Sequence, residues 1–133
     1  MDYVVVDTDV VSFLFKGDTR ASLYRRHLEG KIPAVSFMTV AELLRWSYKK
    51  NWGERRIRQL EERLRNYVVL PYDVEVSRWW ARIQTEREKN GRPISTADAW
   101  VASSAMRHGH PLITHNRGDF EGIDGLVLIS EAS

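Results

Sequence analysis

The sequence predicts an α/β fold, a three-layer sandwich in which a mostly parallel five-stranded sheet has helices on both faces. Short apolar runs alternate along the chain with longer segments whose apolar residues recur every three or four positions. This alternation is typical of parallel strands joined by crossover helices. The first run, Tyr3 to Val6, is apolar throughout and includes three valines, as expected of a strand buried on both faces. At 133 residues, the chain is expected to form one domain over 1–133.

The remaining elements follow in chain order from the same patterns and from turn residues. Val10 to Phe15 predicts the start of a short helix that ends at Gly17 and Asp18, and a second helix runs to Gly30. Strands are expected at 32–36, 68–70, 111–114 and 126–129, and helices from about 37 to 50, 54 to 66, 76 to 90 and 95 to 108. The strand at 68–70 is so short and apolar that we expect it to be buried.

Composition excludes several classes of site. The chain has no cysteine, which rules out disulfides, thiol nucleophiles and cysteine-based zinc sites. No apolar run approaches the roughly 18–20 residues that a membrane helix needs, so we expect a cytoplasmic protein without a membrane partner. The net charge of +2 comes from 20 basic and 18 acidic residues, and it neither demands nor excludes nucleic acid.

Four carboxylates are expected to meet at one end of the sheet. Asp7 directly follows the first strand, and ligands gather at the carboxyl ends of the strands in open α/β sheets. Glu42 lies in the first turns of the helix after the second strand, and Asp98 lies in the first turn of the helix before the fourth. Asp119 lies in the loop just beyond that fourth strand.

Each acid taken alone also has a local structural explanation. Thr39 with Glu42, and Ser95 with Asp98, fit the capping box, in which an acid at the third helical position bonds back to the cap. A loop carboxylate such as Asp119 commonly bonds to its own backbone. Four acids gathered within several ångströms, however, repel one another strongly unless a cation lies among them.

The gathered acids predict metal chemistry. Oxygen ligands favour Mg²⁺, with Mn²⁺ able to substitute, and these ions keep several waters and accept phosphate oxygens. The reaction that follows is hydrolysis of a phosphodiester bond by metal-activated water. No Walker A loop, G-x-S-x-G elbow or H-E-x-x-H motif indicates a different mechanism.

Four motifs occur in order along nearly the whole chain. They are the apolar strand that ends in Asp7-Thr8-Asp9, the helix start Thr39-Val40-Ala41-Glu42, the segment Ile94-Ser95-Thr96-Ala97-Asp98 and the turn Leu112-Ile113-Thr114-His115-Asn116-Arg117-Gly118-Asp119-Phe120. This ordered set resembles a PIN domain. More narrowly, it is similar to the VapC-type toxins of VapBC toxin–antitoxin systems.

The resemblance implies a fold, an activity and a set of site residues. The fold would be PIN-like, and the activity that of a Mg²⁺- or Mn²⁺-dependent endoribonuclease, the toxin of a type II toxin–antitoxin pair. Its catalytic, metal-binding acids would be Asp7, Glu42, Asp98 and Asp119, with pocket-supporting roles for Thr8, Asp9, Thr114 and Asn116. The implied partners are an RNA substrate and a cognate antitoxin, in a homodimer or a toxin–antitoxin hetero-oligomer.

Two other functions remain open. The run from Asp7 to Val11 also fits the D-x-D-x-[TV] opening of haloacid dehalogenase-type phosphatases, in which Asp7 would be the nucleophile and Asp9 the acid. That family also needs a lysine and a cap. The middle of this chain has no lysine at the end of a strand, and its length leaves little room for a cap. The second alternative is a catalytically silent PIN-like module that binds RNA or protein.

The stretch from Lys49 to Arg65 carries a local excess of positive charge. It contains seven basic and three acidic residues, a balance of +4. One interpretation is an edge that contacts phosphates beside the acidic site. The other is a solvated helix face with intrahelical ion pairs, because Glu54, Glu61 and Glu62 are interleaved among the cations.

Overall fold

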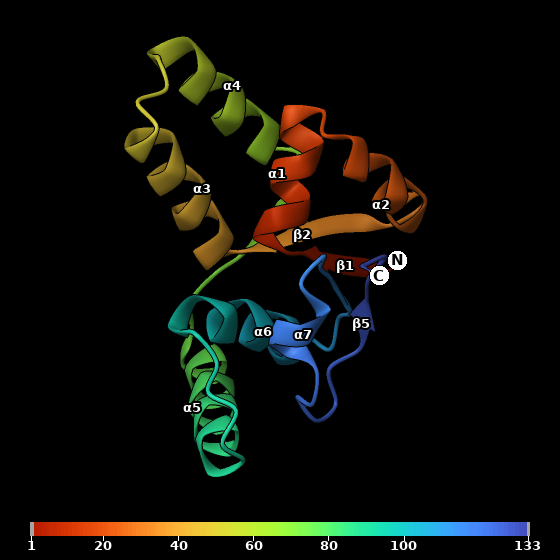
Figure 1. Ribbon diagram of the computed structural model, residues 1–133, viewed down its shortest axis with the longest axis vertical. Helices are drawn as coiled ribbons and strands as arrows, with labels where there is room; N and C mark the ends of the chain where they lie inside the picture. Colours follow the sequence, from red (N-terminus) through yellow and green to blue (C-terminus); the bar gives the residue numbers. More distant parts are fainter. Residues whose placement is uncertain (1, 133) are drawn as a thin grey trace.

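The computed structural model describes residues 2–132, and its elements alternate as the sequence predicts (Figure 1). The strands are β1 (Tyr3–Val6), β2 (Ile32–Ser36), β3 (Val68–Leu70), β4 (Leu112–Ile113) and β5 (Leu128–Ile129). The helices are α1 (Thr8–Lys16), α2 (Ser22–Leu28), α3 (Phe37–Lys49), α4 (Glu54–Leu64), α5 (Val74–Lys89), α6 (Thr96–His108) and α7 (Arg117–Phe120).

All five strands form one parallel sheet in the order β3-β2-β1-β4-β5. The first strand therefore lies at the centre, where Val5 pairs with Ala34 of β2 on one side and with Leu112 of β4 on the other. With neighbours on both edges and helices on both faces, Val4, Val5 and Val6 are almost completely buried, which accounts for the apolar run. The predicted fold class is confirmed.

The alternating side chains of β1 separate two hydrophobic cores, one on each face of the sheet. Val4 and Val6 belong to the core beneath α1, α2, α3 and α4, whereas Val5 belongs to the core beneath α5, α6 and α7. Figure 1 shows these two groups of helices on opposite sides of the sheet. This arrangement is the predicted three-layer sandwich, and it directs the loops at the carboxyl ends of the strands between the two helical layers.

The prediction that strand 68–70 is buried is wrong for two of its three residues. Val68 and Val69 are 42% and 46% exposed, and only Leu70 is buried. The reason is topological, because β3 lies at the edge of the sheet and pairs on one side only. A short apolar run cannot by itself distinguish an edge strand from a central one.

Two short helical turns differ from the predicted elements. One is a 3-10 turn at Thr19–Ala21 that opens the second predicted helix; its cap is Asp18, whose carboxylate accepts a bond from the Arg20 amide at 2.9 Å. The other is α7, a single turn after β4 that the sequence shows only as a loop. No helix within residues 2–132 is long and apolar enough to cross a membrane.

Candidate active site

Asp7 is the N-cap of α1 and lies where the central strand ends. Its amide donates to the carbonyl of Ile113 at 2.8 Å, which continues the pairing of β1 with β4. Its carboxylate accepts from the Thr8 amide at 2.8 Å and from the Thr114 hydroxyl at 2.7 Å. The residue is only 5% exposed. Asp7 and Thr114 are thus fixed against each other by the two central strands from which they project.

Glu42 reaches the same region from α3, but not through the capping box. The cap of α3 is Ser36, which accepts from the Met38 amide at 3.1 Å, so Thr39 already lies inside the helix and the expected Thr39–Glu42 capping box is absent. The buried Thr8 hydroxyl donates to Glu42 Oε1 at 2.8 Å, and the Thr39 hydroxyl lies 3.0 Å from that of Thr8. The first turn of α1 therefore orients this acid.

Asp9 is held by its neighbours rather than free to transfer a proton. Its Oδ1 accepts from the Val10 amide at 2.7 Å, while its Oδ2 accepts from the His115 amide at 3.1 Å and the Asn116 side chain at 3.0 Å. These bonds tie the start of α1 to the loop after β4. The supporting roles expected for Asp9 and Asn116 agree with this geometry.

Asp98 and Asp119 approach from the other helical layer. Ser95 caps α6 by accepting from the Asp98 amide at 3.1 Å, as the sequence predicts. The Asp98 side chain is left half-buried, and together with the exposed Asp119 it lines a hollow of about 540 Å³. Arg92 lies on the same hollow.

Burial raises the pKa of three of these carboxyls, and repulsion between acids adds to the effect for Asp7 and Asp98. For Asp7 the largest cause is loss of solvent, followed by the negative charge of Asp9, with Asp98 also contributing. Burial likewise raises the pKa of Asp98, and Asp119, Glu42 and Asp9 add to the effect. The pKa of Asp9 is raised by burial and partly restored by its hydrogen bonds. The five acids thus share one electrostatic field.

The donor set of this site fits a hard divalent cation. Within residues 2–132, no group of three or more His, Cys, Asp or Glu side chains is arranged to hold a metal ion by itself. Mg²⁺ does not need such a cage, because it binds through one or two carboxylates and fills its shell with waters and phosphate oxygens. The repelling carboxylates of Asp7 and Asp98 are oxygen donors of this kind, and burial makes their uncompensated charge unfavourable.

A PIN domain family model matches residues 4–126 of the chain. The chain belongs to the PIN domain family. It is 30% identical to a curated VapC ribonuclease of Sinorhizobium fredii, with 96% of each chain covered. It is 27% identical to the tRNA(fMet)-specific endonuclease VapC of Shigella flexneri, with 92% of each covered. A crystal structure of DNA-bound VapBC from Salmonella typhimurium is 25% identical and covers 98% of both chains, with a TM-score of 0.87. The predicted VapC-type resemblance is confirmed.

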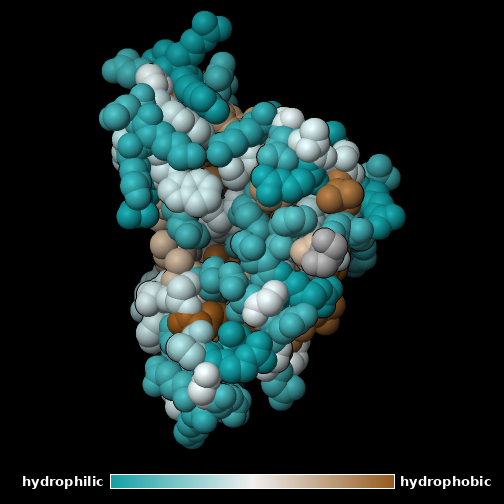
Figure 2. Space-filling model, in the orientation of Figure 1, coloured by the Kyte–Doolittle hydropathy of each residue, from teal (hydrophilic) through white to brown (hydrophobic). Residues whose placement is uncertain are grey.

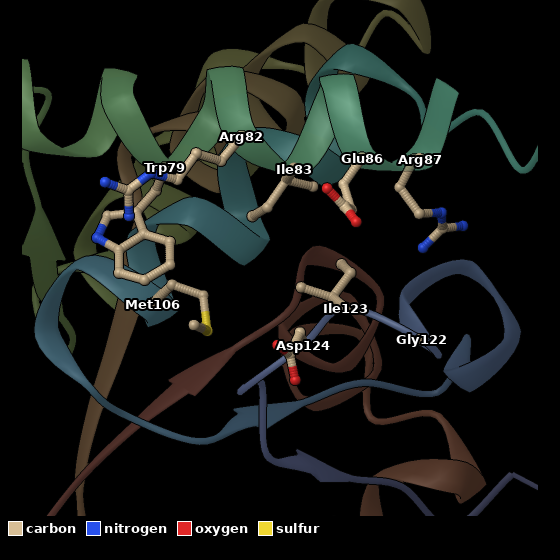
Figure 3. Close-up of a pocket in the computed structure, with 9 residues that line it drawn as sticks. All are labelled: Trp79, Arg82, Ile83, Glu86, Arg87, Met106, Gly122, Ile123 and Asp124. Atoms are coloured by element: carbon tan, nitrogen blue, oxygen red, sulfur yellow. The ribbon is translucent and has the colours of Figure 1, made fainter. Parts of the chain in front are cut away.

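This PIN domain also contains a positioning residue that its sequence gave no reason to select. Arg87 of α5 is only 6% exposed, and its guanidinium donates to the carbonyls of Arg92 at 2.6 Å, Glu121 at 3.3 Å and Asp119 at 3.3 Å. Figure 3 shows it at one end of a row of α5 side chains, on the side of Gly122. The chain around Asp119 is therefore anchored by an arginine more than thirty positions earlier.

Replacement of Asp7 by Asn should stabilise the metal-free PIN domain at neutral pH. Below the ordinary value of 3.8, folded and unfolded states both hold the Asp7 proton. As the pH rises, the unfolded state ionises first, so the raised pKa lowers the stability of the folded parent. Urea midpoints in EDTA should be higher for Asp7→Asn at pH 7 and converge with the parent near pH 3.5–4. A lower midpoint at pH 7 would contradict the electrostatic argument.

Replacement of Arg87 by Gln should loosen the chain that carries Asp119. A shorter neutral amide cannot reach three carbonyls, and bonds from a charged donor stabilise by about 1.5–3 kcal/mol each. Hydrogen exchange at 117–122 should accelerate, and the free energy of unfolding should fall by about 2–4 kcal/mol. Arg82→Gln, on the same helix and over the Trp79 ring, is the matched control. Unchanged protection at 117–122 in Arg87→Gln would refute the anchoring role.

Proposed function

We propose that this PIN domain is a Mg²⁺- or Mn²⁺-dependent endoribonuclease and the toxin of a toxin–antitoxin pair. The observation that carries the proposal is the approach of four acids from four elements. Asp7 caps α1, and Glu42, Asp98 and Asp119 lie on α3, α6 and α7, where Glu42 and Asp119 help to raise the pKa of Asp98. The names of the curated relatives, VapC ribonucleases over nearly their whole length, support the reaction class.

Each residue has a separable task in this reaction. Bound Mg²⁺ or Mn²⁺ would polarise the scissile phosphate and supply an activated water. Asp7 and Asp98 are the acids best placed to hold the ion, since burial makes their charge most in need of a cation. Thr114 and Thr8 fix the orientation of Asp7 and Glu42 through their hydroxyls. Asp119 reaches the site from the exposed side, where substrate enters.

The phosphatase alternative has no structural support. It requires Asp9 to exchange a proton with substrate, but both carboxylate oxygens of Asp9 accept bonds from Val10, His115 and Asn116. The family match over residues 4–126 is to the PIN domain. A catalytically silent module is disfavoured because its acids would be buried and mutually repelling without a role.

The proposed partners are an antitoxin and a second copy of the chain. Solved structures similar to this chain include VapBC complexes, which supports an antitoxin partner. For the second copy, we point to a face along the edge of the sheet and the start of α5. There Val68, Val69, Tyr72 and Val74 are between 42% and 62% exposed. Exposed apolar side chains gathered in this way are typical of a protein interface.

Replacement of Asp98 by Asn tests the catalytic proposal. The helix cap survives, because the Ser95 hydroxyl accepts its capping bond from the backbone amide of residue 98. We expect unchanged or higher stability in EDTA and a loss of RNA cleavage in Mn²⁺ of about a hundredfold or more. The parent should also melt higher in Mn²⁺ than in EDTA, since a ligand at 100 times its Kd stabilises by about 2.7 kcal/mol.

Asp124→Asn is the control for Asp98→Asn, because Asp124 lines a separate cavity beside α5 (Figure 3). It should cleave at the parent's rate. Full cleavage by Asp98→Asn, or identical melting of the parent in EDTA and Mn²⁺, would refute the proposal.

The proposed homodimer face is tested by Tyr72→Ser, with Val127→Ser as a control that removes an equally exposed apolar side chain elsewhere. Tyr72 is 60% exposed and Val127 is 63% exposed. Sedimentation over a range of concentrations should show a dimer for the parent and the control, and a shift towards monomer for Tyr72→Ser. Parent protein that is monomeric throughout would remove this proposal.

A further inference from the structure

A groove lined by cations lies at the far end of α1 from the acids. Lys16, the last residue of α1, faces Arg56 and Arg63 of α4 across a hollow of about 500 Å³. Lys50 joins this group from the end of α3 and helps to lower the pKa of Lys16, after the effect of burial. We call this hollow the basic groove.

The cations of the basic groove are positioned by aromatic rings. The guanidinium of Arg56 lies 4.0 Å from the centre of the Trp52 ring, and that of Arg63 lies 6.0 Å from Phe15. Phe15 and Trp52 are themselves stacked at 5.8 Å. These contacts restrict the long side chains before any ligand binds, which lowers the entropy lost on binding.

The positive charge of the groove is not neutralised by the chain. Among residues 2–132 there are six ion pairs, and none includes Lys16, Lys50, Arg56 or Arg63. The intrahelical pairs considered for the stretch from Lys49 to Arg65 do not form in this part of the structure. Glu62 is the single acid among the lining residues.

The lining favours a nucleic acid over a protein. Protein interfaces have apolar centres, whereas nucleic-acid interfaces are polar and strongly positive. None of the large apolar side chains that are exposed within residues 2–132 lines this groove. Figure 2 shows a largely hydrophilic surface over α4, at the top of the view.

We propose that the basic groove binds the phosphodiester backbone of single-stranded RNA outside the cleavage site. The proposal rests on the proposed ribonuclease function for the identity of the strand, although binding itself requires no catalysis. Along the axis of α1, Lys16 lies nine residue steps from Asp7, a separation of about 13.5 Å. At about 3.4 Å for each stacked nucleotide, this distance corresponds to roughly four nucleotides. Substrates long enough to reach both places should therefore bind more tightly than short ones.

The test is RNA binding by the full chain in EDTA, where cleavage cannot occur. A fluorescently labelled single-stranded RNA of about 20 nucleotides is titrated at several salt concentrations. For the double variant Lys16→Gln with Arg56→Gln we expect roughly tenfold weaker binding and a salt slope shallower by about 1.4, since each phosphate contact to a single strand contributes about 0.7. Arg82→Gln, which removes a cation that also covers a tryptophan, should bind like the parent.

Cleavage in Mn²⁺ separates this proposal from the proposed function. The double variant should show a raised KM with unchanged kcat on the long RNA, and parent rates on a trinucleotide that cannot reach the groove. Parent affinity and salt slope in the double variant would overturn the inference, even if the parent cleaves RNA. If the parent binds RNA through the groove but does not cleave it, the inference about the groove stands and the proposed ribonuclease function is refuted.

Discussion

The burial of the Asp7 carboxylate is the constraint around which this molecule is built. Its backbone continues the central strand and its side chain caps α1, so it can leave neither the core nor the site. The bonds from Thr8 and Thr114 each stabilise the charged form by about 1.5–3 kcal/mol. Removal of a carboxylate from water opposes this by several kcal/mol, and nearby Asp9 and Asp98 add repulsion. Burial and repulsion therefore oppose the charged form of Asp7 in the folded chain, and they raise the pKa of its carboxyl.

The sequence was sufficient for the fold because its strongest signals are local. Four apolar residues before Asp7 indicated a strand buried on both faces, and the structure places that strand between two neighbours. The cap at Ser95 was likewise visible in the sequence, because its hydrogen bond joins residues only three positions apart. The position of Asp7 also followed from a general property of parallel sheets, in which polar residues at the carboxyl ends of the strands lie at one edge.

The features that the sequence could not supply depend on contacts between distant segments. Val68 and Val69 look buried until the strand order places them at an edge. Thr39 looks like a cap until the true cap is found three residues earlier, where Ser36 ends β2 and starts α3 without a loop. Arg87 looks like any arginine on a helix, and only its bonds to Asp119 and Glu121 reveal that it positions the site.

Helix α1 has groups of opposite charge at its two ends. Asp7 lies at its N-terminus and Lys16 in its last turn, so the helix dipole favours both charges. The effect is worth about 0.3–1 kcal/mol for exposed groups and up to about 2 kcal/mol when partly buried. This is too small to offset the burial of Asp7, and it does nothing to neutralise the other cations around Lys16. Under the proposed function, a divalent cation would balance the acids at one end of the helix, and RNA phosphates would balance the cations at the other. A single strand of RNA long enough to follow α1 would then meet both groups of charge.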